Sequence, residues 1–189
     1  MIFMRIPVKY IYPVMMIVLF VFALSGAAMQ IDEYILKAVY LEHFVTFIEW
    51  PQQKDSVKEN KSIVIGVYGK TNMLNALQKT YSKKTIGNKK VIVLPLSDLN
   101  KSDQCHILFI GNLSEKDLNY TIAALRDKPV LMISENKGYA LKGVHINFFL
   151  LENNVRFEIN EKAAIDAGFH ISHHLLKLAK VVGIKGTNK

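Results

Sequence analysis

Residues 144–160 (VHINFFLLENNVRFEIN) constrain the fold of this chain most strongly, because they have the pattern of a β-hairpin. Apolar residues alternate along both arms, so each arm presents one continuous apolar face. Asn153-Asn154 is expected to form the turn, because asparagine tolerates the positive φ angles of two-residue hairpin loops. This turn places Leu150 opposite Phe157 and puts the hairpin at the edge of a sheet. The opposite face then carries His145, Asn147, Arg156, Glu158 and Asn160.

Short apolar runs alternate with helical patterns through the middle of the chain. Continuous apolar strands separated by helices are typical of a parallel sheet that is covered on both faces. We therefore expect an α/β fold: a Rossmann-like three-layer domain with a mostly parallel sheet and a C-terminal antiparallel hairpin. The expected strands are 62–68, 90–96, 105–110 and 130–134, and the helices between them are 72–81 and 114–126.

Helices are also expected before the sheet and after the hairpin. Residues 33–50 contain neither glycine nor proline, and Pro51 ends the segment. Most of the circumference of this helix is apolar, so it packs on two sides or presents one side to a partner. Trp50 at its end is either an aromatic residue at the core edge or a binding anchor. The C-terminal helices are expected at 161–167 and 173–182, with Asn160 and Ser172 as their N-caps.

The first 28 residues have the three parts of a secretory signal peptide. Two basic residues precede an uncharged apolar run at 11–24, and small residues follow it. Cleavage is expected after Ala27 or Ala28. An uncleaved membrane anchor is the alternative, but the run is shorter than the roughly 20 residues that a spanning helix needs. Pro13 also interrupts it.

Residues 29–189 are expected to form a single domain. The whole chain has a formal net charge of +8, but its lysines are not interleaved with aromatic residues as in proteins that bind single-stranded nucleic acid. Nucleic acid is therefore not an expected partner; solubility, a membrane surface or an acidic partner explains the charge. The single cysteine, Cys105, cannot form an internal disulfide, and burial in its strand is expected. The alternatives are a reactive thiol and a disulfide between two chains.

Patterns that could support catalysis or metal binding are weak. Gly69-Lys70-Thr71 lies between a strand and a helix like the end of a phosphate-binding loop, but Val64 occupies the position of the required first glycine. His170, His173 and His174 have no accompanying carboxylate or thiolate, so no metal site is expected. We find no nucleophile motif and no pair of acids spaced for acid–base catalysis. We therefore expect no catalytic residues, no cofactor and no enzymatic activity.

The polar face of the hairpin is the best clustered candidate for a ligand site. His145, Asn147 and Glu158 would be its ligand-binding residues. The alternative is structural: Arg156 and Glu158 lie two residues apart on one face, so they can pair with each other or with neighbouring strands.

Several segments form an ordered set of motifs along the chain: 38–51 (AVYLEHFVTFIEWP), 105–110 (CHILFI), 128–134 (KPVLMIS), 146–148 (INF), 155–160 (VRFEIN), 163–168, 171–172 and 175–182. Together, and in this order, they resemble the YfiR-like family. This resemblance implies a small periplasmic α/β regulator without known catalysis. Members are often dimeric, so a homodimer is also expected. Paired cysteines, which some members use, are absent here.

The resemblance also implies a mode of action. Family members bind the periplasmic part of an inner-membrane signalling protein, usually a diguanylate cyclase, which they hold inactive so that cyclic-di-GMP output and biofilm formation stay low. Interface hot spots favour tryptophan, tyrosine and arginine, so Tyr40, Trp50 and Arg156 are the predicted partner-binding residues. The alternative is a small-ligand sensor or an accessory protein of an outer-membrane receptor or sensor kinase. A hydrolase or nucleotide enzyme would rest on Gly69-Lys70-Thr71 alone.

Overall fold

The computed structural model of the protein describes residues 32–51 and 62–183. The predicted signal peptide and the loop predicted at 52–60 lie outside the described residues. Within the described residues, no helix is both long and apolar enough to cross a membrane.

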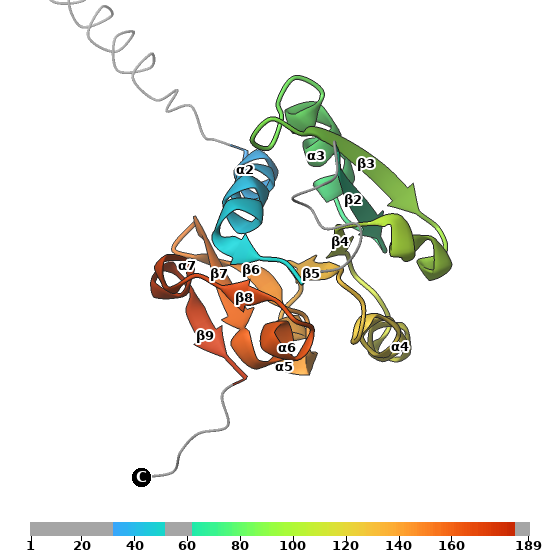
Figure 1. The fold of residues 1–189 in the computed structure, drawn as a ribbon, viewed down its shortest axis with the longest axis vertical. Coiled ribbons are helices and arrows are strands. Elements are labelled where there is room, and N and C mark those ends of the chain that lie inside the picture. Colours follow the sequence, from blue (N-terminus) through green and yellow to red (C-terminus); the bar gives the residue numbers. More distant parts are fainter. Residues whose placement is uncertain (1–31, 52–61, 184–189) are drawn as a thin grey trace, which may run out of the picture. The chain divides into compact units, whose positions relative to one another are not determined.

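A mixed sheet forms the centre of the fold, with the strand order β3-β2-β4-β5-β6-β7-β9 (Figure 1). From β3 to β6 all neighbours are parallel, β6 and β7 are antiparallel, and β9 is parallel to β7. The predicted fold class, a mostly parallel α/β sheet with an antiparallel C-terminal hairpin, is confirmed. The strands are β2 (Ser62–Tyr68), β3 (Lys90–Leu96), β4 (Ile107–Ile110), β5 (Leu131–Ser134), β6 (Ile146–Leu151), β7 (Asn154–Asn160) and β9 (Lys180–Val182).

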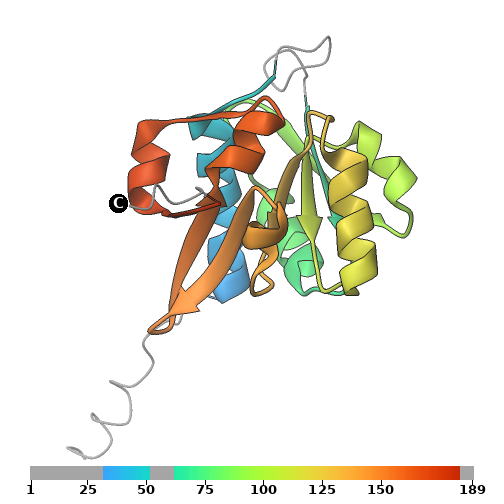
Figure 2. The ribbon, with the colours of Figure 1, turned by 90° about the horizontal axis from the view of Figure 1, so that it is seen from below.

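Helices cover both faces of this sheet (Figure 2). One face packs against α2 (Glu33–Phe47), α3 (Met73–Tyr81) and α7 (His173–Leu178). The other packs against the 3-10 helix η2 (Leu99–Gln104), α4 (Glu115–Leu125) and α5 (Tyr139–Lys142). The short helix α6 (Glu161–Asp166) follows β7 directly, and β1 (Ile48–Glu49) pairs with β8 (His170–Ile171) beside the main sheet.

The central strands contribute side chains to two separate hydrophobic cores. In β4, Ile107 and Phe109 face the α2 side, whereas Leu108 and Ile110 face the α4 side. This division explains why the strand is a continuous apolar run, because both of its faces are buried. Cys105 joins the core on the α4 side and is buried as expected, and burial raises the pKa of its thiol to about 11.

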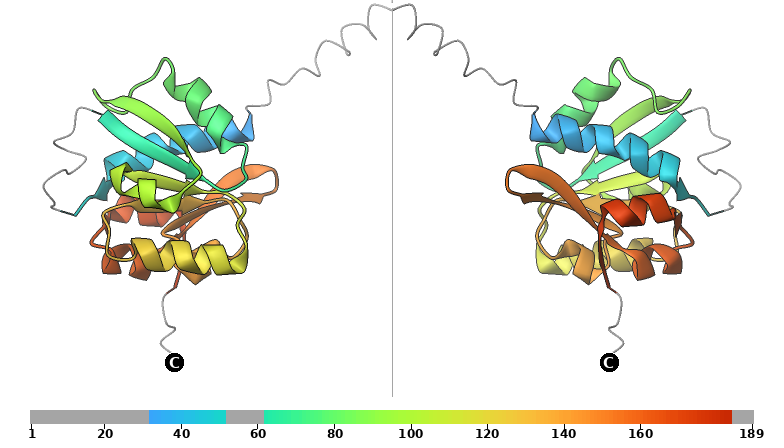
Figure 3. Two further views of the ribbon diagram at one scale, coloured as in Figure 1. Left: turned by 90° about the vertical axis from the view of Figure 1, so that its right-hand side faces the viewer. Right: turned by 90° about the vertical axis from the view of Figure 1, so that its left-hand side faces the viewer.

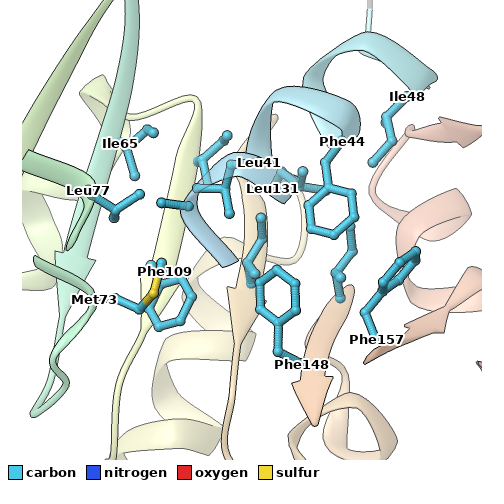
Figure 4. Packing of buried hydrophobic residues seen from close by; sticks show 14 of the residues in the cluster. Leu41, Phe44, Ile48, Ile65, Met73, Leu77, Phe109, Leu131, Phe148 and Phe157 are labelled. Atoms are coloured by element: carbon cyan, nitrogen blue, oxygen red, sulfur yellow. The ribbon is translucent and has the colours of Figure 1, made fainter. Parts of the chain in front are cut away.

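An aromatic cluster beneath α2 forms part of the first core (Figure 4). The ring of Phe44 lies 5.6 Å from Phe148 and 5.2 Å from Phe157, measured between centroids. Tyr40, one turn earlier, lies 6.0 Å and 5.6 Å from the same two rings. The hairpin and the first helix are therefore held together by aromatic packing.

The hairpin turn differs from the prediction by one residue. Its loop is Glu152-Asn153, both with positive φ (50° and 62°), and not Asn153-Asn154. Leu150 consequently pairs with Val155. The predicted register is wrong by two residues, an even number, so each side chain still faces the predicted side.

The observed register brings Phe148 directly opposite Phe157. Both rings contact Phe44 in this register. The last pair of the ladder is Leu151–Asn154. Tertiary packing therefore outweighs the preference of asparagine for both loop positions.

Two predicted helices end earlier than expected. The first stops at Phe47, because Ile48–Glu49 pairs as β1 with β8. The last stops at Leu178, because Lys180–Val182 continues as β9 and pairs with Glu158, Ile159 and Asn160. This pairing makes β9 the edge strand, so the prediction that the hairpin forms the sheet edge is wrong.

Several local predictions are confirmed. The Asn160 side chain accepts a hydrogen bond from the Ala163 amide at the start of α6. The side chain of Ser172 accepts one from the Leu175 amide at the start of α7. Gly168, two residues beyond α6, has a φ of +83°, the left-handed conformation that is typical of a glycine just after a helix.

The turn assignment leads to a test of stability. Glu152→Asn is expected to raise the free energy of unfolding by roughly 0.5–1 kcal/mol, because asparagine adopts positive φ more readily than glutamate. Glu152→Gln, which gains no such preference, should leave it unchanged. Urea unfolding of the two variants checks this. Equal stability of both variants and the parent would contradict the Glu152-Asn153 turn.

Candidate functional site

The crevice where many α/β proteins bind ligands is filled in this chain. The chain runs from β2 to β3 on one side of β2 and then crosses to β4 on the other side, so the strand order reverses between β2 and β4. In α/β sheets, ligands usually bind beyond the carboxyl ends of the two strands at such a reversal. Here the amide of Asn112 donates to the Lys70 carbonyl at 2.9 Å. A Cβ atom on Gly111 would lie 2.7 Å from the same oxygen. The loop with Gly69-Lys70-Thr71 thus pairs with the neighbouring loop instead of forming an open phosphate cradle.

A buried charged cluster lies next to this point. Lys37 of α2 is 3% exposed, and its ammonium contacts the carboxylates of Glu33 and Glu135, the latter at 2.6 Å. Thr71 donates a hydrogen bond to the other Glu135 oxygen at 2.7 Å. Burial alone would lower the pKa of Lys37, but the two carboxylates outweigh it and raise that pKa. The cluster ties α2 to the segments that follow β2 and β5.

Aromatic side chains at helical spacing continue from the edge of the aromatic cluster beneath α2 to the exposed side of this helix. Tyr40 is half-buried, His43 is exposed and Phe47 is 39% exposed. Their rings follow one another, with 6.2 Å from Tyr40 to His43 and 6.2 Å from His43 to Phe47. The helix is thus packed on one side and open on the other, one of the two arrangements that its composition allows.

The tip of the hairpin carries two exposed leucines. Leu150 is 50% exposed and Leu151 is 54% exposed. Leu150 lies on the face of the hairpin that also carries Phe148, beneath α2. Figure 3 shows α2, the hairpin and α7 together on one side of the fold. We call Tyr40, His43, Phe47 and Leu150 the α2–hairpin surface.

The three predicted partner-binding residues do not form one patch. Tyr40 belongs to the α2–hairpin surface. Arg156 is exposed but pairs with Phe149 on the opposite face of the hairpin. Trp50 is half-buried with its indole edge-on to Phe169 at 5.3 Å, and its Nε1 finds no hydrogen-bond partner among the described residues. Trp50 therefore serves mainly in packing within the fold.

The three predicted ligand-binding residues lie on one face, but they are buried. Asn147 donates to Glu158 at 3.3 Å across the hairpin, and both are almost completely covered. Glu158 forms an ion pair with Lys180 of β9 at 3.8 Å. The edge strand β9, which was not predicted, supplies this partner, so Glu158 serves the sheet instead of an open binding site.

His145 extends the sheet from the position just before β6. Its Nδ1 accepts a hydrogen bond from the Met132 amide of β5 at 3.1 Å. His106, just before β4, accepts one in the same way from the Val64 amide of β2. His145 is 1% exposed, and burial lowers its pKa to about 4, so the ring is neutral at pH 7.

The clustered histidines are spread over two elements. His170 lies in β8 opposite Glu49, whereas His173 and His174 begin α7. In residues 32–51 and 62–183, no three histidine, cysteine or acidic side chains come together as a metal site would require.

A cavity of about 430 Å³ opens on the α4 side of the sheet. Met132 and His145 are its most buried lining residues, and Leu141, 70% exposed, lines it as well. Of the predicted ligand-binding residues, only His145 lines this cavity. No sequence pattern indicates this cavity, because α4, α5 and α6 come together there only in the folded chain.

Other features were also missed from the sequence. His43 and Phe47 follow Tyr40 at three- and four-residue spacing, and this helical spacing could have identified them. The Lys37–Glu135 pair joins residues 98 positions apart. No local pattern indicates such a contact.

Comparison with known proteins gives one family and a general fold. The sequence model of the YfiR/HmsC-like family matches residues 34–180. A search of curated protein sequences found no match. Among solved structures, a conserved domain protein from Vibrio cholerae O1 biovar eltor aligns with a TM-score of 0.52 at 12% identity, covering 76% of this chain and 59% of its own.

A second solved structure is less similar. The ABC domain in complex with L-Trp from Streptococcus pneumonia aligns with a TM-score of 0.47 at 11% identity, covering 64% of this chain and 55% of its own. This chain thus spans less than two thirds of both proteins. At such low identity, the Vibrio likeness concerns the fold alone.

The charged cluster predicts a large effect of a single substitution. Lys37→Met should lower the free energy of unfolding by roughly 2–3 kcal/mol, because Glu135 loses its buried cation but keeps its bond from Thr71. Lys37→Met combined with Glu135→Gln should recover most of this loss. Lys79→Met, at an exposed position of α3, is the matched control. Chemical denaturation that shows no loss for Lys37→Met would contradict the role of the cluster.

The burial of His145 predicts a pH dependence. Its pKa is about 4 in the fold and near 6.5 when unfolded, so the unfolded chain binds more protons between these values. Stability from this group is complete above pH 6.5 and is lost toward pH 4, by about 3 kcal/mol. His145→Asn keeps an acceptor for the Met132 amide and should reduce the dependence of the free energy of unfolding on pH in this range. His174→Asn, at an exposed position, should not. Urea unfolding at several pH values measures this dependence. The same pH dependence in His145→Asn and the parent would contradict the lowered pKa of His145.

Proposed function

Because the chain belongs to the YfiR/HmsC-like family, we propose that it binds and represses the periplasmic part of an inner-membrane signalling protein. At the level of the family, the match supports a periplasmic regulator of cyclic-di-GMP signalling. The proposed partner is a diguanylate cyclase, so that binding lowers cyclic-di-GMP and biofilm formation. A cleaved signal peptide at residues 1–28 would deliver the protein to the periplasm.

The α2–hairpin surface is the observation that carries this proposal. It combines aromatic side chains on a packed helix with an exposed leucine on the adjoining strand. Exposed aromatic and apolar side chains gathered on one side of a fold often mark a protein interface. Aromatic residues also supply much of the binding energy in interfaces, because they bury a large area with few rotatable bonds.

Both faces of the hairpin tip are accessible to a partner. Leu150 is exposed on the α2 side, while Leu151 and Arg156 are exposed on the other. A partner that encloses the tip would contact Tyr40 and Leu150 on one side and Arg156 on the other. In this way two of the three predicted partner-binding residues would serve one interface, while Trp50 supports the end of α2 from within.

Repression of this kind requires no chemistry from the regulator. A regulator that binds the inactive conformation of the cyclase more tightly shifts the population toward that state by its differential affinity. We therefore propose a non-enzymatic role. The paired loops at the usual α/β ligand crevice and the raised pKa of the Cys105 thiol support it.

Cellular cyclic-di-GMP tests this proposal. Deleting the gene should raise cyclic-di-GMP, and expressing the wild-type protein should reverse the rise. A protein with Phe47→Ser and Leu150→Ser should not reverse it, because losing two interface contacts weakens binding by roughly tenfold to a hundredfold. Both positions are exposed, so stability should change by less than about 1 kcal/mol.

Ile92→Ser provides the matched control. Ile92 is 43% exposed on β3, at the other edge of the sheet, so this variant should repress like the wild type. No rise on deletion would exclude a diguanylate cyclase as the partner. Full repression by the double variant would exclude the α2–hairpin surface.

A further inference from the structure

The cavity on the α4 side has the features of a binding site. This site is separate from the α2–hairpin surface. Its volume of about 430 Å³ lies within the range of small-molecule sites in proteins. Two of its lining residues, Ile122 and Met132, belong to the core on the α4 side. The sheet therefore stands between this cavity and the helix α2.

The lining combines buried apolar side chains and the buried polar residues His145 and Asn160 with exposed charged residues. Met132 is 1% exposed and Ile122 is 9% exposed, whereas Leu141 brings an exposed apolar side chain to the opening. Arg126 and Lys142 line the cavity at exposed positions. An organic molecule with an apolar body and a charged end matches such a lining, because each part then meets a compatible environment.

Arg126 carries the charge that is available to a ligand. Lys142 pairs with Glu115 at 2.7 Å, and Lys162 pairs with Asp166 at 2.5 Å. Arg126 has no ion-pair partner within the described part of the chain. A guanidinium presents a planar set of donors that matches the two oxygens of a carboxylate, so a carboxylate is the anion it would bind best.

His145 is one of the most buried residues of the cavity lining, and its ring also packs against Phe169 at 5.4 Å between centroids. Its Nδ1 accepts from the Met132 amide, so the proton of the neutral ring is on Nε2. No group among residues 32–51 and 62–183 accepts from this Nε2–H. The group opposite it should be an uncharged acceptor, such as a carbonyl or hydroxyl oxygen, because a charge would be costly at this buried position.

We propose that this cavity binds a small organic monoanion with a carboxylate at one end, a short apolar body and an uncharged oxygen acceptor at the other. Arg126 binds the carboxylate at the opening. Ile122, Met132 and Leu141 contact the body, and His145 donates to the inner oxygen. This site does not depend on the proposed repressor role, because it uses other residues on the other face of the sheet.

Isothermal titration calorimetry with the purified protein tests the site. The probe is 5-oxohexanoate, which has all three parts. Hexanoate lacks the inner oxygen and should bind about threefold more weakly or worse. The ketone 2-hexanone lacks the carboxylate and should bind about tenfold more weakly or worse. Acetate, without the apolar body, should give no measurable binding.

Variants at exposed positions test the residues without disturbing the fold. Arg126→Gln should weaken 5-oxohexanoate binding about tenfold and remove its preference over 2-hexanone. Leu141→Ser should weaken the binding of 5-oxohexanoate and of 2-hexanone by the same factor. Lys116→Gln, on the exposed side of α4 and outside the cavity lining, should bind like the parent.

Three outcomes would overturn the proposal. These are no binding of 5-oxohexanoate at tens of millimolar, equal binding of 2-hexanone, and parent-like binding by both Arg126→Gln and Leu141→Ser. Each concerns the isolated protein without its partner. Failure of the ligand proposal is thereby distinguishable from failure of the repressor proposal.

Discussion

The packing of α2 on the C-terminal half of the sheet is the contact on which the rest of the structure depends. Phe44 packs against Phe148 and Phe157, which face each other across the hairpin. Lys37, two turns earlier, ties the same helix to Glu135 beyond β5. Together these contacts determine which side of α2 is buried, and therefore which aromatic side chains are left for a partner.

The sequence predicted the elements that local pattern determines and missed those that depend on distant contacts. Ser62–Tyr68 and Lys90–Leu96 were predicted with their observed bounds, because each is a short apolar run with clear breaks on both sides. Val182 lies at helical spacing from Leu178 and Ala179, yet Lys180–Val182 pairs with β7 as a strand. Local spacing cannot reveal this pairing, because the free edge of β7 exists only after the hairpin has formed.

The candidate sites show the same division. The sequence correctly placed His145, Asn147 and Glu158 on one face of the hairpin, but it could not show that they are buried by other elements. Tyr40 and Arg156 fall on opposite faces, since their relation depends on where α2 packs. The α2–hairpin surface and the cavity lie on opposite sides of the sheet. A partner and a small ligand would therefore not compete directly for the same residues.

Site-specific photocrosslinking in living cells tests the central claim most directly. A photoreactive phenylalanine analogue at Phe47 should crosslink to an inner-membrane protein with a diguanylate cyclase domain, and the same analogue at Ile92 should not. Both positions are similarly exposed, at 39% and 43%, so accessibility alone cannot produce the difference. Crosslinking to the cyclase from Ile92 but not from Phe47 would contradict the assignment of the α2–hairpin surface as the partner-binding site.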